Sequence, residues 1–151
     1  MREIKGDLIA LALSGEFDVI VHGCNCFCTM GAGIAKGIAA TFPEALEEDR
    51  QTIKGDRGKL GQVSVAEIVR DDLRLFVVNA YTQFDWRGRG RKADYDAIRS
   101  SFSIIADRFA GKRIGFPMIG AGLAGGEWQV IEGIIKAELN ALDHTLVVFD
   151  G

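Results

Sequence analysis

Two glycine-rich segments of this 151-residue chain have the spacing of loops that bind phosphate groups. The first contains Gly31 and Gly33, the second contains Gly120 and Gly122, and each lies between a strand-like and a helix-like stretch. Glycine has no Cβ, so its peptide groups approach a diphosphate closely, and the helix that follows directs free N–H groups at the anion. The segments therefore predict a diphosphate ligand, unless the glycines only form tight turns.

The second segment also matches the dinucleotide-binding pattern G-x-G-x-x-G through Gly120, Gly122 and Gly125, with Asp150 as an acidic residue at the end of the next strand. An NAD-dependent oxidoreductase is one interpretation. A dinucleotide fold needs further βαβ units, for which a chain of this length has no room. Neither segment continues into the Gly-Lys-Ser/Thr of a nucleoside triphosphatase loop. We therefore expect a diphosphate clamp rather than a Rossmann domain or a kinase.

Three polar residues near these segments could take part in catalysis. His22 directly precedes the first segment and is a candidate general acid or base, although a strand-end histidine can also be a hydrogen-bonded neutral imidazole. Asn25 lies within that segment, and Asp85 lies in a later loop, where its carboxylate could orient water. A basic stretch, residues 87–92, follows Asp85 and could close over a terminal phosphate, contact RNA or simply be solvated.

Composition narrows the class of protein. The net charge of −3 argues against a dedicated nucleic-acid binder, and no apolar run is long enough to span a membrane. The N-terminus lacks the apolar core of a secretory signal, so a cytoplasmic location is expected. Cys24, Cys26 and Cys28 have the wrong spacing for most zinc sites, and we expect free thiols, no metal and no cofactor.

Strand and helix patterns alternate along the chain. Apolar and alternating stretches predict strands, and apolar residues at helical spacing predict helices. Strands are expected at residues 2–5, 17–21, 61–69, 73–80, 113–118 and 145–149, and helices at 8–13, 34–42, 43–51, 93–109 and 127–142. Such alternation predicts one α/β domain over residues 1–151, a three-layer α/β/α sandwich with a mixed, mostly parallel central sheet. Ligands of these sheets bind beyond the carboxyl ends of the strands.

Four motifs in order resemble those of the macrodomain family. They are Gly6-Asp7-Leu8, the run from Val19 to Asn25, the run from Gly31 to Ala35, and Gly120-Ala121-Gly122-Leu123. The resemblance covers nearly the whole chain. The sequence is most similar to the branch of ADP-ribose 1″-phosphate phosphatases and to the neighbouring branch, which hydrolyses ADP-ribosyl esters. The resemblance implies ADP-ribose as the ligand, with ADP-ribosylated protein as a further partner class. Separately, we expect a monomeric protein.

The resemblance also implies roles for individual residues. Asp7 would accept a hydrogen bond from the adenine amino group, or act only as a helix cap. Phe149 would pack beside adenine, or be plain core, and Asn25 would contact the distal ribose. The remaining implied ligand residues are Leu8 at the ring, Thr29, Met30, Gly31, Ala32, Gly33 and Ile34 in the first loop, and Ile119, Gly120, Ala121, Gly122, Leu123 and Ala124 in the second.

Two departures from the family pattern leave the activity open. The ester-hydrolysing branch uses a lysine after the central strand and an aspartate beyond the second glycine loop, and in this chain we expect Ala80 and Ala124 at those positions. A covalent route through lysine is therefore not expected. Hydrolysis at the distal ribose, assisted by Asn25, His22 or Asp85, and binding of ADP-ribose without turnover are the two remaining interpretations.

Overall fold

A computed structural model describes residues 1–150 of the chain. The strands are β1 (Arg2–Gly6), β2 (Val19–Cys24), β3 (Val63–Arg70), β4 (Leu73–Tyr81), β5 (Ile114–Phe116) and β6 (His144–Phe149). The helices are α1 (Leu8–Leu13), α2 (Gly33–Thr41), α3 (Pro43–Arg50), α4 (Tyr95–Arg108) and α5 (Trp128–Glu138), and a short 3₁₀ helix, η1, covers Arg57–Lys59. Every strand and helix expected from the sequence is present, with ends displaced by a few residues.

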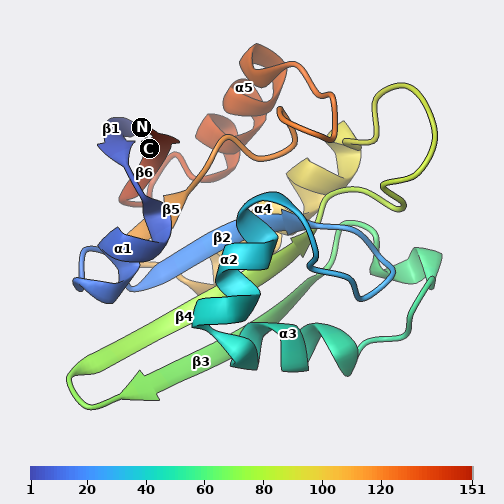
Figure 1. Ribbon diagram of the computed structural model, residues 1–151. Helices are drawn as coiled ribbons and strands as arrows, with labels where there is room; N and C mark the ends of the chain where they lie inside the picture. Colours follow the sequence, from blue (N-terminus) through green and yellow to red (C-terminus); the bar gives the residue numbers. More distant parts are fainter. Residues whose placement is uncertain (151) are drawn as a thin grey trace.

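The six strands form one sheet in the order β1-β6-β5-β2-β4-β3 (Figure 1). All neighbouring strands are parallel except β3 and β4, which form an antiparallel hairpin at the edge. Asp71 has φ 42° in the turn of this hairpin. The mixed, mostly parallel sheet expected from the sequence is confirmed.

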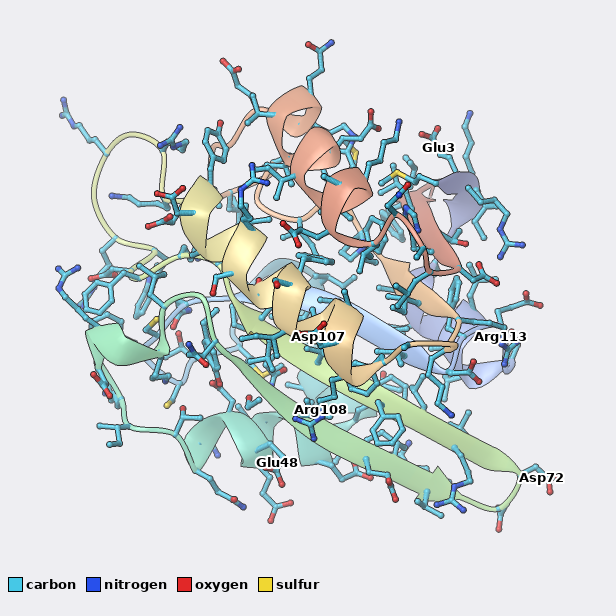
Figure 2. The ribbon with its side chains drawn as sticks, turned by 180° about the vertical axis from the view of Figure 1, so that it is seen from behind. Glu3, Glu48, Asp72, Asp107, Arg108 and Arg113 are labelled. Carbon is cyan, nitrogen blue, oxygen red and sulfur yellow. The ribbon has the colours of Figure 1, made fainter. Side chains whose placement is uncertain are left out.

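Helices cover both faces of the sheet. On one face, β2 and β4 bury Val19 and Val78 against α4 and α5, which contribute Phe102 and Ile135. On the other face, the same strands bury Ile20 and other side chains against α1, α2 and α3. Figure 2 shows the side that carries α4 and α5, and Figure 1 the opposite side. The two cores make the three-layer sandwich.

The parallel strands β1, β2, β4, β5 and β6 all end at the same edge of the sheet. Both glycine loops and the basic loop after β4 therefore start from this edge, and so does α1, which begins directly after β1 (Figure 1). Across residues 1–150, no helix is both long and apolar enough to cross a membrane.

Candidate functional site

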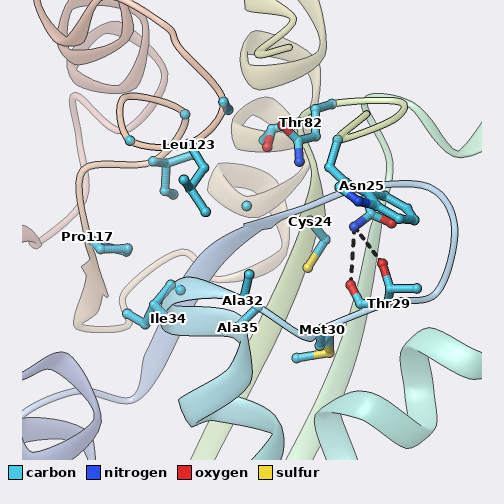
Figure 3. Close-up of a pocket in the computed structure, with 18 of the residues that line it drawn as sticks. Cys24, Asn25, Thr29, Met30, Ala32, Ile34, Ala35, Thr82, Pro117 and Leu123 are labelled. Atoms are coloured by element: carbon cyan, nitrogen blue, oxygen red, sulfur yellow. Dashed lines mark hydrogen bonds between the residues drawn. The ribbon is translucent and has the colours of Figure 1, made fainter. Parts of the chain in front are cut away.

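Two adjoining hollows lie at the carboxyl edge of the sheet. The larger has a volume of about 760 Å³ and is bounded by the first glycine loop, the start of the loop after β4, and the second glycine loop (Figure 3). The smaller, of about 530 Å³, lies between the start of α1 and the end of β6. Gly33, Ile34, Pro117 and Met118 line both hollows, so together they form one elongated cleft.

The first glycine loop presents unpaired donors to the cleft. A Cβ added to Gly31 or Gly33 would meet no atom within 4 Å, and Gly33 has φ +59° at the start of α2. The backbone N–H groups of Ala32, Gly33 and Ile34 donate no hydrogen bond within the described residues. The positive end of the α2 dipole is therefore open to an anion in the cleft.

The glycines of the second glycine loop have two different roles, close packing of the chain and access for a ligand. A Cβ on Gly120 would lie 3.1 Å from Ile131 Cδ1, and one on Gly126 would lie 2.6 Å from the Gly120 carbonyl oxygen, so these two allow close packing of the chain. Gly122 instead faces open space. Within residues 1–150, the N–H groups of Gly122, Leu123 and Ala124 donate no hydrogen bond. Gly122 is thus the position in this loop where a ligand can approach.

Asn25 occupies one end of the larger hollow with its amide already oriented. Its Nδ2 donates to Thr29 Oγ1 over 2.9 Å and to the Thr29 carbonyl over 3.2 Å, and its Oδ1 accepts from the backbone N–H of Phe27 (Figure 3). Pro117 lies at the opposite end of this hollow in the same view.

Asp7 and Phe149 lie in the smaller hollow, beyond Pro117. One carboxylate oxygen of Asp7, Oδ1, caps α1 by accepting from the N–H groups of Ile9 and Ala10. Its Oδ2 makes no hydrogen bond within the described chain, so the helix cap and a contact with a ligand are compatible. The Phe149 side chain is 71% exposed, which excludes the interpretation that it is plain core.

Comparison with known proteins decides the family. The family model described as Macro domain matches residues 21–135. A relative from Enterobacteria phage T4, "Uncharacterized 17.5 kDa protein in tk-vs intergenic region", is 38% identical over 97% of this chain and 95% of its own. The chain belongs to the macrodomain family.

Solved structures agree with this macrodomain fold. A protein of unknown function from Bacteroides thetaiotaomicron superposes with a TM-score of 0.81 at 28% identity, over 97% of this macrodomain and 96% of that chain. Thermosipho africanus DarTG in complex with ADP-ribose has a TM-score of 0.77 at 15% identity, over 98% of this macrodomain and 42% of that longer chain.

The cleft gathers nearly all of the ligand residues that the sequence predicted for this macrodomain. Asp7, Leu8 and Phe149 line the smaller hollow, and the predicted residues of both glycine loops line the larger one, with the exception of Ala121. Ala121 lies next to the open Gly122, and its own N–H donates to the Met118 carbonyl.

His22, a predicted acid or base, does not line the cleft of the macrodomain. Its side chain is fully buried, and its Nε2 lies 2.7 Å from Asn79 Oδ1. The Asn79 amide donates to Ala45 and Ser64, so its oxygen accepts and His22 Nε2 carries the proton. Burial lowers the pKa of His22 to about 4, so the imidazole is neutral at neutral pH. This geometry is that of a hydrogen-bonded, neutral imidazole with a structural role rather than that of a general acid or base.

Asp85 also lies outside the cleft lining. Its carboxylate is bound by the guanidinium of Arg87 through contacts of 2.9 Å at Oδ1 and Oδ2. The hydrogen bond from Arg87 lowers the pKa of Asp85 below its ordinary value, so the group is a carboxylate with its charge already paired. Asp85 therefore pairs with a residue of its own loop and does not line the cleft.

Three cleft residues after β4 were missed by the sequence reasoning. Ala80, the residue expected at the position of the family's lysine, is fully buried within β4 and does not line the cleft. Thr82, Gln83 and Trp86 line the cleft instead, and the Gln83 side-chain oxygen is buried without a hydrogen-bond partner. The sequence signal that could have identified them is the end of the apolar run at Tyr81, because the residues after it no longer belong to the sheet. Ala124 does line the cleft, as expected.

The wall of the larger hollow carries no aspartate, glutamate, histidine, lysine or arginine among the described residues. Its one titratable side chain is Cys24, whose pKa is raised well above its ordinary value by burial, so it is a neutral thiol. No cluster of three metal-binding side chains was found in residues 1–150. Any anion in this hollow is therefore held by backbone N–H groups rather than by ion pairs.

Proposed function

We propose that this macrodomain binds ADP-ribose along the cleft and hydrolyses the bond between its distal ribose and an attached group. Adenine occupies the smaller hollow, where Asp7 Oδ2 accepts from its amino group and Phe149 packs beside the ring. The diphosphate crosses the larger hollow, and the distal ribose reaches Asn25. The observation that carries the proposal is the pair of open glycine loops, which have unpaired N–H groups and line the same uncharged hollow.

Backbone donors suit a diphosphate because two loops can bind several oxygens at once without a counter-ion. The DarTG structure with bound ADP-ribose shares this fold, which supports the same ligand here. The attached group is a 1″-phosphate or an acyl ester. Because the wall offers no charged acid or base, the chemical step rests on a water held beside the anomeric carbon by Asn25.

Isothermal titration calorimetry tests the binding. ADP-ribose should bind far more tightly than AMP or ribose 5-phosphate, because only ADP-ribose fills both hollows and the diphosphate clamp. Equal affinity for AMP and ADP-ribose would overturn the clamp. Incubation with ADP-ribose 1″-phosphate, O-acetyl-ADP-ribose and glutamate-ADP-ribosylated protein then identifies the leaving group.

A second function, binding of ADP-ribose without turnover, is favoured by the uncharged cleft wall. It differs from the first in one measurable respect. A protein that binds ADP-ribose but releases no group from any of the three substrates is a binding module.

A further inference from the structure

The three cysteines of the C-x-C-x-C segment are free thiols in three different environments. Cys24 is 4% exposed, and its Sγ lies 3.5 Å from His22 Nε2. Cys26 is fully buried, and its thiol donates to the Gln83 carbonyl. Burial raises the pKa of both, that of Cys26 to about 11, so these two are neutral thiols. Cys28 is partly exposed and lies outside the cleft lining, so it is the thiol most open to solvent.

A buried lysine is directed at the Cys28 sulfur. Lys59 is 7% exposed, and its Nζ donates to Cys28 Sγ over 3.5 Å and to the Cys26 carbonyl over 3.0 Å. The centroid of the Tyr81 ring lies 4.8 Å from this Nζ. An ammonium has three N–H groups, so the third has no oxygen or sulfur acceptor within residues 1–150.

The Lys59 ammonium also lacks a counter-ion in contact with it. It forms no ion pair with a carboxylate in the part of the chain that the structure describes. The nearby Asp49 carboxylate accepts instead from the Tyr81 hydroxyl, and its second oxygen, Oδ2, is buried without a partner. A buried charge without a partner is costly. A negative charge at the Cys28 sulfur would supply the counter-ion that Lys59 lacks.

The Cys28 thiol fastens the first glycine loop to the end of α3. It donates to the Asp49 carbonyl over 3.2 Å, and Thr52 Oγ1 lies 3.5 Å from the sulfur. The Cys28 backbone has φ 58°, a left-handed conformation that costs energy in a residue other than glycine. The next residue, Thr29, holds the Asn25 amide (Figure 3). The place of the thiol and the orientation of Asn25 are therefore linked through adjacent residues.

We propose that Cys28 is a site of reversible oxidation by hydrogen peroxide, and that its oxidation releases the first glycine loop from α3. The sulfur attacks as a thiolate, whose charge the Lys59 ammonium stabilises. A bond forms between the sulfur and one peroxide oxygen, and the O–O bond breaks. The leaving hydroxide keeps the electron pair and takes up the proton of the thiol to give water. The sulfur loses two electrons and becomes a sulfenic acid, while the peroxide gains two.

The added oxygen changes the contacts of Cys28 on both sides. The third N–H of Lys59 can donate to a sulfenate oxygen in a charge-assisted hydrogen bond. The sulfenate has no proton to donate to the Asp49 carbonyl, and the two oxygens repel one another. The loop thus loses its tie to α3, and Thr29 no longer holds Asn25 in place. This consequence rests on the proposed function, which places the distal ribose at Asn25.

Dithiothreitol reverses the modification. One of its thiols attacks the sulfenic sulfur and water leaves, which gives a mixed disulfide with Cys28. Its second thiol then attacks this disulfide, so Cys28 returns to a thiol and the reagent becomes a cyclic disulfide.

Labelling with dimedone, which traps sulfenic acids, locates the oxidation in the absence of any ligand. The full chain is treated with peroxide and dimedone, and the labelled residue is identified by peptide mass spectrometry. The label should appear on Cys28, with Cys24 and Cys26 unlabelled in the folded protein. A label on either of those two instead, or an intramolecular disulfide in place of the label, would overturn the inference.

A matched pair of lysine variants tests the part played by the ammonium. Lys59→Met should slow the labelling of Cys28 about tenfold, the scale of one lost charge-assisted hydrogen bond. Lys54→Met removes the same charge from an exposed side chain of the same segment and should leave the labelling rate unchanged. Equal labelling rates in the two variants would contradict the role of Lys59.

The effect on the site is measured as phosphate release from ADP-ribose 1″-phosphate before and after peroxide. Native protein should lose turnover about tenfold on oxidation, with a smaller loss of ADP-ribose affinity, and regain it with dithiothreitol. Cys28→Ser keeps a hydroxyl that can donate to the Asp49 carbonyl but is not oxidised, so its rate should be the same before and after peroxide.

Unchanged turnover in labelled native protein, or an equal loss in peroxide-treated Cys28→Ser, would also overturn the inference. The serine variant keeps the test decisive even where Lys59→Met folds poorly. Failure of the proposed function looks different, because the untreated protein would then release no phosphate, while the dimedone label would still report whether Cys28 is oxidised.

Discussion

The Asn25 amide is tied to the Thr29 hydroxyl by a hydrogen bond of 2.9 Å within the first glycine loop. With Oδ1 also accepting from the N–H of Phe27, the amide is oriented before any ligand arrives. Asn25→Ala should therefore reduce turnover about 100-fold, a typical cost of misplacing a reacting group, while ADP-ribose affinity falls less. Thr29→Val should give a smaller loss and Thr29→Ser almost none, measured as phosphate release from ADP-ribose 1″-phosphate. Equal losses in turnover and affinity for Asn25→Ala would show that Asn25 only binds.

Gly122 offers a clean test of the diphosphate clamp. Its Cβ position is open and its φ is not in the left-handed region, so Gly122→Val should fold normally and still fill the space of the phosphate. We expect ADP-ribose binding to be lost and the melting temperature to be nearly unchanged. Gly133→Val is the control, because Gly133 is equally open but lies on the exposed side of α5. Retained binding in Gly122→Val would place the phosphates elsewhere.

The sequence predicted this fold well wherever local chemistry determines structure. Asp7 followed by an apolar helix pattern predicts α1 with its observed bounds, because the Asp7 side chain caps that helix. β2, in contrast, was expected to end at residue 21 and continues to Cys24. Its extra residues pair with β4, where Cys24 faces Tyr81 in the register, and such long-range pairing leaves no local signal.

The same limit applies to the candidate site. The glycine loops could be recognised because glycine itself carries the signal. The burial of His22 depends on Asn79, a neighbour from a distant strand that no pattern around His22 reveals. Gln83 and Trp86 reach the cleft because the bond from Cys26 N–H to the Phe84 carbonyl directs the loop after β4. These positions follow from tertiary structure rather than from spacing.

Asp7 combines two functions that one substitution can separate. Serine is as good a helix cap as aspartate but has no second acceptor for adenine, so Asp7→Ser should retain thermal stability and weaken ADP-ribose binding by about 1 kcal/mol. The hypoxanthine analogue of ADP-ribose lacks the amino donor, so its affinity should fall little in Asp7→Ser. Calorimetry with both ligands measures the difference. Equal losses for the two would mean that Asp7 is only a cap.

His22 makes the stability of the fold depend on pH. Its pKa is about 4 in the folded protein because of burial, against about 6.5 when unfolded, so the unfolded state binds the proton more readily. Above pH 6.5, neutral His22 makes its full contribution to the free energy of unfolding. This contribution, about 3 kcal/mol in total, is lost as the pH falls towards 4. Urea unfolding at pH 7.5 and 5 should show most of this loss.

His22→Gln serves as the control for this prediction. Its amide can still donate to Asn79 but does not titrate, so the pH dependence between 7.5 and 5 should largely disappear. Asp49 acts in the opposite direction at lower pH, since burial raises its pKa and its protonation favours the folded state. Turnover of His22→Gln at pH 7.5 should stay within a few-fold of the native rate, because His22 does not touch the cleft. A loss of about 100-fold or more would restore it as an acid–base group.

The cleft wall also predicts the route that the proposed hydrolysis would take. A covalent intermediate needs a nucleophile beside the anomeric carbon, and the lining of the larger hollow includes no lysine or carboxylate within residues 1–150. Gln83 is the polar side chain that lines the hollow directly after Thr82, and Cys24 is a neutral thiol because burial raises its pKa. Direct attack by water is the route that remains.

Two measurements test this route. Borohydride treatment during turnover of ADP-ribose 1″-phosphate should give no ADP-ribosyl adduct by mass spectrometry, and Cys24→Ser should retain turnover. The rate should also vary little between pH 6 and 9, because no group in the wall changes its charge over about that range. The substrate phosphate titrates near pH 6, so the O-acetyl substrate, which lacks it, gives the cleaner profile. A trapped adduct on any residue, or a profile with a steep limb near neutrality, would contradict direct attack by water.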